Sequence, residues 1–274
     1  MPKVRVNGLA LHYRELGPDH PTTILYVSSV LWGGEAFDDM LTELAKDFHL
    51  VIPDLHGHGK SDYREFMTLE GMTEDFHVLM KTLRLQHVVW FGCSIGGMIG
   101  MRLALAYPDL LDALVLMSTT ARPDPPEIRE PTLQLWQMFR AGHREDIVDS
   151  AMKFFFAART YQDRPDLIAK YRTALIEMKQ VDGMYAAVLA AFNRSDMGDA
   201  IRRISLPTLV MTGREDSAAT PAQAAFIAAH IPNAQVEIIN EANHLVGIEK
   251  PFEISRLVRA FLARTLPGLK PMVA

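Results

Sequence analysis

The chain has little of several features that mark particular classes of protein. Its 274 residues include one cysteine, Cys93, so no disulfide can form within the chain, and we expect a reducing compartment. Lys and Arg number 28 against 33 Asp and Glu, without a basic stripe, which predicts no nucleic-acid partner. No apolar run is long enough to span a bilayer, and the charged first residues lack the apolar core of a secretory signal. We therefore expect a cytoplasmic protein with no membrane partner.

What the sequence does contain is an alternation of short β-prone segments with helical ones. This alternation predicts an α/β fold, with a mostly parallel sheet of eight strands flanked by helices. Asn7-Gly8, a strong signal for a two-residue turn, should join the first two strands as a hairpin. The expected strands are residues 3–6, 9–15, 23–28, 50–53, 87–92, 113–118, 208–212 and 235–239, and the expected helices are 36–47, 67–83, 96–107, 221–230 and 251–266.

Residues 121–200 break this rhythm, because they contain no convincing strand. Helical patterns at 133–141, 147–158, 166–179 and 184–192 follow a proline-rich stretch. Bulky apolar side chains are frequent here, and each could simply pack between helices. We predict a helical lid (cap) inserted after the sixth strand, with residues 1–120 and 201–274 forming the core domain.

The pentapeptide Gly92-Cys93-Ser94-Ile95-Gly96 is the strongest local signal in the chain. It lies between an apolar, β-prone run at 86–91 and a helical run at 97–106. A strand that turns sharply into a helix holds its central residue in a strained conformation, and glycines on both sides relieve the crowding. The pattern predicts a nucleophile elbow that presents the Ser94 hydroxyl at the sheet edge. Cys93 should be a small buried residue that points away from the cleft.

A serine needs a base to take its proton and a third group to orient that base. In sheets with such an elbow, an acid and then a histidine follow the serine along the chain. Asp216 follows the expected strand 208–212, and His244 follows 235–239. Both lie just past strand ends, where open α/β sheets place ligands. The alternatives are Glu215 as the acid, Asp216 as a loop or capping carboxylate, and His244 as a surface residue.

An oxyanion hole would complete this arrangement by stabilising negative charge during acyl transfer. The backbone N–H of Ile95, directly after Ser94, is one expected donor. The second should come from the loop after the third strand, residues 27–34, and we assign it to the N–H of Val30.

His56 and His58 have the spacing of a metal-binding pair. A metal would need further ligands, and only Asp54 and Asp62 lie near them in the sequence. We therefore expect a glycine-rich loop after the fourth strand and no metal.

Taken together, these residues resemble the α/β-hydrolase fold family over nearly the whole chain. The matching stretches are the loop from Pro53-Asp54 to Ser61, the elbow and Gly97-Met98 after it, the acid loop from Gly213 to Asp216 with Thr220-Pro221, and Asn243-His244. Within the family, the likeness is greatest to 3-oxoadipate enol-lactonases and related small-ester hydrolases. It rests on residues 183–187 with Ala190-Ala191, and on Ser28-Ser29, where most members of the family have His-Gly.

The resemblance implies hydrolysis of a small carboxylic ester or lactone through an acyl-enzyme, with no metal or organic cofactor. Ser94 would be the nucleophile, His244 the base and Asp216 the orienting acid. An arginine of the lid could bind a substrate carboxylate, and a homo-oligomer is possible. The expected pocket residues are Ser29, Trp32, Trp136, Phe155 and Tyr185, and the candidate arginines are Arg122, Arg140, Arg144 and Arg159.

Three other functions fit the same residues. The first is a carbon–carbon bond hydrolase of ring-cleavage products, which uses the same three groups. The second is an acyltransferase or perhydrolase, in which an alcohol or peroxide intercepts the acyl-enzyme. The third is a non-catalytic ligand receptor, although a receptor has no need of all three side chains.

Overall fold

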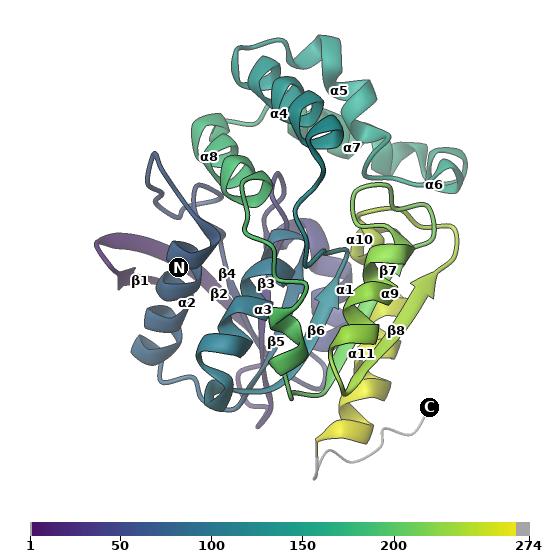
Figure 1. Ribbon diagram of the computed structural model, residues 1–274. Coiled ribbons are helices and arrows are strands. Elements are labelled where there is room, and N and C mark those ends of the chain that lie inside the picture. The colour runs from purple at the N-terminus through teal and green to yellow at the C-terminus, as the bar shows by residue number, and fades with distance from the viewer. Residues whose placement is uncertain (1, 267–274) are drawn as a thin grey trace.

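The fold is built on one eight-stranded sheet. The computed structural model describes residues 2–266, so the predicted core domain extends beyond the described part at both ends. The strands lie in the order β1-β2-β4-β3-β5-β6-β7-β8, which confirms the predicted α/β class (Figure 1). They are β1 Lys3–Val6, β2 Leu9–Leu16, β3 Thr23–Val27, β4 His49–Pro53, β5 Val88–Cys93, β6 Leu111–Met117, β7 Thr208–Gly213 and β8 Ala234–Ile239.

The sheet is mostly parallel, as predicted. β1 and β2 form an antiparallel hairpin, and its turn residues Asn7 and Gly8 have φ angles of 45° and 86°, as a type I′ turn requires. β2 is also antiparallel to β4, and every later pairing is parallel. The carboxyl ends of β3, β5, β6, β7 and β8 therefore share one edge of the sheet.

Helices cover both faces of the sheet. Side chains alternate along β3, so that Ile24 and Tyr26 face a cluster containing α1 and α11, while Leu25 and Val27 face one containing α2, α3 and α9. These two layers bury the apolar surface that drives folding. Their helices are α1 Asp38–Leu44, α2 Leu69–Thr82, α3 Ile95–Ala106, α9 Pro221–His230, the short α10 Val246–Glu249, and α11 Pro251–Thr265.

Five further α-helices lie between β6 and β7 in the chain, followed by the short 3-10 helix Ala200–Arg203. In Figure 1 the five α-helices gather together beyond one end of the sheet. We call them the α4–α8 segment. They are α4 Pro126–Arg140, α5 Arg144–Met152, α6 Ala158–Asp163, α7 Pro165–Ile176 and α8 Val181–Phe192.

The boundaries of this segment differ from the sequence expectation, most of all at the start of α4 and between α5 and α6. α4 begins at Pro126 rather than at residue 133 and contains Pro131. Proline is well suited to the first turn of a helix, because its φ angle is already helical and no N–H is needed there. α5 ends at Met152 instead of continuing to residue 158, and α6 was not expected. The carbonyl groups between these two helices bond to a distant loop, as described below. Within residues 2–266, none of the helices combines the length and the apolar character needed to cross a membrane.

Candidate active site

Ser94 lies at the sharp turn between β5 and α3. Its φ and ψ angles are 52° and −112°, an unfavourable conformation for a residue with a Cβ. Neighbouring groups hold it there: the Ser94 N–H donates to the carbonyl oxygen of Met117 at 2.9 Å, and the Thr119 hydroxyl donates to the carbonyl oxygen of Ser94 at 2.7 Å. The strained turn is therefore fixed by bonds to the end of the neighbouring strand β6 and the loop after it.

The glycines of the pentapeptide allow the helix to approach the sheet closely. A Cβ on Gly96 would lie 2.2 Å from the carbonyl oxygen of Val27, and one on Gly92 would lie 2.3 Å from the backbone of Gly96. Both distances are far inside van der Waals contact, and the obstructing atoms are backbone. Glycine is thus a steric requirement of this turn.

The structure brings Ser94, His244 and Asp216 together at the carboxyl edge of the sheet. His244 Nε2 lies 3.2 Å from Ser94 Oγ, and His244 Nδ1 lies 3.1 and 3.0 Å from the two carboxylate oxygens of Asp216. All three residues are buried, Ser94 being 9% exposed. The geometry allows the ring to accept the serine proton at Nε2 while its Nδ1–H donates to the carboxylate.

Asp216 is held by its own loop. Its Oδ1 accepts the backbone N–H groups of Ala218 at 2.9 Å and Ala219 at 2.7 Å, and the Thr212 hydroxyl lies 3.1 Å from its Oδ2. Burial acts to lower the pKa of His244, but the charge of Asp216 and its hydrogen bond to the ring, with a contribution from Glu249, raise that pKa above the usual 6.5. A raised pKa makes the imidazole a stronger base.

Glu215, the alternative acid, lies elsewhere. Its side chain is exposed, and its Oε2 accepts the backbone N–H of Ala158, at the start of α6, at 3.1 Å. The contacts with His244 belong to Asp216.

The loop after β3 is buried beside this centre. Ser28 and Ser29 are almost fully buried, and the Ser29 hydroxyl donates to the carbonyl oxygen of Val30. Leu31 has a positive φ of 82°, and its N–H donates to His58 Nε2 at 3.1 Å. The His58 Nδ1–H donates in turn to the carbonyl oxygen of His56 at 3.0 Å. Burial lowers the pKa of His58, which favours the neutral ring that this arrangement requires.

The two histidines of the H-x-H spacing are thus bonded within the protein. His56 Nε2 lies 2.9 Å from Asp75 Oδ2, a carboxylate that also accepts from Arg64 at 2.6 Å. Among the described residues, no group of three or more His, Cys, Asp or Glu side chains is arranged to hold a metal ion. The role of His58 in holding Leu31 could not be found from sequence spacing.

Three of the five expected pocket residues form one aromatic cluster next to His244. Phe155, between α5 and α6, packs with its ring centroid 4.8 Å from Trp32 and 6.3 Å from Trp136. Its ring centroid is also 6.1 Å from that of His244. Tyr185 on α8 is half-buried, with the Arg140 guanidinium 5.1 Å from its ring centroid. The fifth, Ser29, lies in the buried loop described above.

The four candidate arginines all have partners of their own. The Arg122 guanidinium lies 3.9 Å from the ring centroid of Phe226, and Arg144 donates to two main-chain carbonyl groups at the C-terminus of α7. The other two form ion pairs, Arg140 with Asp182 at 2.6 Å and Arg159 with Asp163 at 2.5 Å.

The chain belongs to the alpha/beta hydrolase fold family, whose model matches residues 23–251. The chain is 25% identical over 265 residues to 3-oxoadipate enol-lactonase 2 of Acinetobacter baylyi, covering 93% of this chain and 94% of the relative. It is 28% identical over 252 residues to a protein of Pseudomonas syringae that carries the provisional name carbamate hydrolase RutD, covering 89% and 95% of the two chains.

Solved structures agree with this assignment. The enol-lactonase of Burkholderia xenovorans superimposes with a TM-score of 0.86 at 28% identity, over 96% of this chain and all of the other. A thermophilic esterase from Thermogutta terrifontis gives 0.88 at 27% identity, over 97% and 99%. These likenesses confirm the predicted family and its resemblance to enol-lactonases, and they support hydrolase activity.

Proposed function

We propose that the protein is a serine hydrolase that cleaves a small carboxylic ester or lactone through an acyl-enzyme. The observation that carries this proposal is the chain of contacts from Ser94 Oγ to His244 Nε2 at 3.2 Å and from His244 Nδ1 to Asp216 at 3.0 and 3.1 Å. A hydroxyl, an imidazole and a carboxylate in this order can activate the serine for nucleophilic attack.

In the first half of the reaction, Ser94 Oγ attacks the carbonyl carbon of the substrate while His244 Nε2 takes its proton. His244 then gives that proton to the leaving alkoxide, which leaves an acyl group on Ser94. In the second half a water molecule attacks the acyl carbon and gives its proton to His244, which returns it to Ser94 as the acid leaves. Asp216 orients the ring and stabilises its charged form in both halves.

Two backbone N–H groups would bind the negative oxygen that develops in each half. One is the N–H of Ile95, the first residue of α3, where the helix dipole also favours negative charge. The other is that of Val30. Its neighbour Leu31 does not compete for this role, because the Leu31 N–H already donates to His58.

The surroundings favour a neutral, compact substrate beneath a lid formed by the α4–α8 segment. Trp32, Trp136 and Phe155 would supply apolar walls, with Ser29 and Tyr185 nearby in the pocket. The partners of Arg122, Arg140, Arg144 and Arg159 argue against a role for these side chains in binding a substrate carboxylate. We therefore propose neutral esters and lactones rather than the carboxylate-bearing enol-lactone.

The first test is Ser94→Ala, assayed with p-nitrophenyl acetate. Removal of the nucleophile should lower kcat by about 10⁴-fold or more, while the circular dichroism spectrum stays that of the wild type. Near-full activity in this variant would overturn the assignment.

A substrate panel tests the second part of the proposal. Neutral esters and lactones of graded size should be cleaved with higher kcat/KM than their analogues carrying a free carboxylate. Preference for carbamates, for a vinylogous 1,5-diketone acid, or for acyl transfer to added alcohol or peroxide would overturn this substrate class and support one of the other reactions.

A further inference from the structure

The loop that carries His244 is bonded to the α4–α8 segment on both sides of the histidine. Before it, the Asn243 side chain donates from Nδ2 to the carbonyl oxygens of Lys153 at 3.1 Å and Phe156 at 3.2 Å. After it, the Leu245 N–H donates to the carbonyl oxygen of Phe155 at 3.1 Å. The turn between α5 and α6, which also brings the Phe155 ring against His244, therefore packs directly on this loop.

Glu249, at the end of α10, makes the central connection. Its Oε2 accepts the backbone N–H of Asn243, directly before His244, at 2.7 Å. Its Oε1 accepts the backbone N–H of Ala157 at 2.7 Å and the hydroxyl of Thr160. One buried carboxylate thus binds the catalytic loop with one oxygen and the start of α6 with the other.

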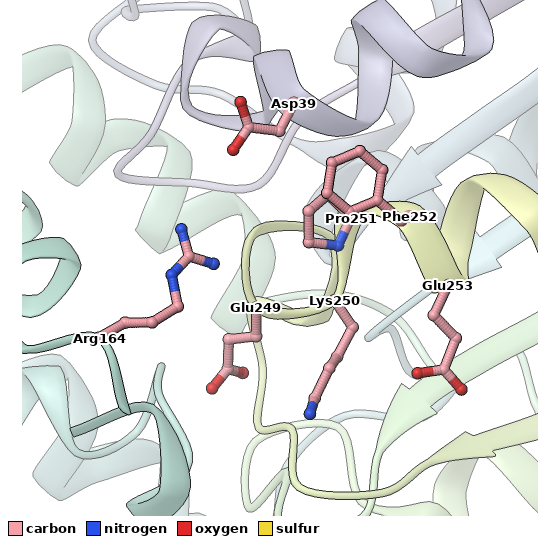
Figure 2. Close-up of a pocket in the computed structure, with 7 residues that line it drawn as sticks. All are labelled: Asp39, Arg164, Glu249, Lys250, Pro251, Phe252 and Glu253. Atoms are coloured by element: carbon pink, nitrogen blue, oxygen red, sulfur yellow. The ribbon is translucent and has the colours of Figure 1, made fainter. Parts of the chain in front are cut away.

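The surroundings of Glu249 make these bonds energetically important. The side chain is buried, which raises its pKa, while its hydrogen bonds from Thr160, Ala157 and Asn243 lower that pKa by favouring the charged carboxylate. Hydrogen bonds to a charged acceptor in such a site are about twice as strong as neutral ones. Glu249 lines a pocket of about 320 Å³, and Arg164 of the α4–α8 segment lines the same pocket (Figure 2). Arg164 Nη1 also lies 3.4 Å from the carbonyl oxygen of Ile248.

We propose that Glu249 is a positioning residue. Because it binds both residues 153–160 and the loop of His244, it makes the position of His244 depend on whether residues 153–160 are seated, that is, packed against this loop. The inference rests on the proposed function, because it assigns His244 as the base. When residues 153–160 are seated, the backbone on both sides of His244 is fixed and Nε2 points at Ser94. When they move away, Asn243 and Leu245 lose their partners and the ring loses its support from Phe155.

This role predicts a particular kinetic signature. His244 acts in both acylation and deacylation, so misplacing its ring slows both steps together. KM, which depends on the ratio of the two rates, then changes little while kcat falls. Loss of an apolar wall of the pocket would instead raise KM.

The test is Glu249→Gln, which preserves side-chain shape but removes the charge and places an amide donor among three other donors. The value of kcat is expressed per active site, counted by titration with a fluorophosphonate. It should fall about 10- to 100-fold, as expected for a base displaced by a fraction of an ångström. KM should stay within about threefold of the wild-type value, because acylation and deacylation slow together. The rate constant for fluorophosphonate labelling should fall in parallel.

The matched control is Glu253→Gln, at the same pocket (Figure 2), which should leave kcat unchanged.

If Glu249→Gln does not fold, Thr160→Val replaces it. Thr160→Val removes a single donor to the same carboxylate, and it should lower kcat several-fold at constant KM. An unchanged kcat in the folded variant, or a rise in KM alone, would overturn the proposal. Failure of the proposed function is seen separately, as activity that survives Ser94→Ala.

Discussion

At the scale of single residues, the site combines a strained serine, the proposed nucleophile Ser94, with an imidazole whose pKa is raised. The backbone of Ser94 has a cost of about 1–3 kcal/mol, and bonds to Met117 and Thr119 hold it in place. His244 is fixed on one side by Asp216 and on the other by the Phe155 ring. Since Ser94, Asp216 and His244 are all buried, their mutual electrostatic interactions are weakly screened.

The raised pKa of His244 predicts the pH dependence of kcat/KM. The ring must be neutral to accept the Ser94 proton, so activity is lost as the pH falls through the pKa of the free enzyme. Because Asp216 raises that pKa above 6.5, the midpoint of the acid limb should lie above this value. It is measured as kcat/KM for a neutral ester between pH 4 and 9.

The control for this profile is Asp216→Asn. Loss of the negative charge should move the midpoint downward and reduce the plateau. A midpoint below 6.5 in the wild type, or an upward shift in the variant, would contradict the proposed role of Asp216.

At the scale of elements, the sequence predicted what depends on local pattern. Strand–helix alternation was enough to predict a mostly parallel sheet, and the loops that follow parallel strands all lie at one edge of such a sheet. The meeting of Ser94, Asp216 and His244 follows from this. The turn between α5 and α6 could not be predicted, because its carbonyl groups bond to Asn243 and Leu245 about 90 residues further along the chain. Glu249 was missed for the same reason, since a carboxylate five residues after a histidine gives no local signal.

The aromatic turn between α5 and α6 allows a direct comparison of two neighbouring phenylalanines. Phe155 is buried against Trp32 and Trp136, whereas Phe154 is 49% exposed. Phe155→Ala should lower the free energy of unfolding by about 3 kcal/mol and reduce activity, because it leaves a cavity beside His244. Phe154→Ala should change it by no more than about 0.5 kcal/mol. Urea denaturation of both variants measures the difference, and equal effects would contradict the packing described.

At the scale of the whole molecule, one apolar cluster joins the sheet to the α4–α8 segment. It contains Ile24 and Val115 from the sheet together with Trp136, Phe139 and Val188 from the segment. The segment therefore has no separate core. We expect a single cooperative unfolding transition, with the same midpoint by tryptophan fluorescence and by circular dichroism. Two separated transitions would show that the segment unfolds independently.

Cys93, the residue directly before Ser94, gives this transition a chemical reporter. It is the only thiol of the chain, it is fully buried in the same cluster, and burial raises its pKa. Because thiol reagents react with an accessible thiolate, the folded protein should remain unmodified and the unfolded chain should take up one equivalent. The rate of modification in buffer without denaturant would then measure how often the interior beneath Ser94 opens to solvent. Modification of this one native thiol thus reports the frequency of local opening around the site, and no label has to be engineered into the protein.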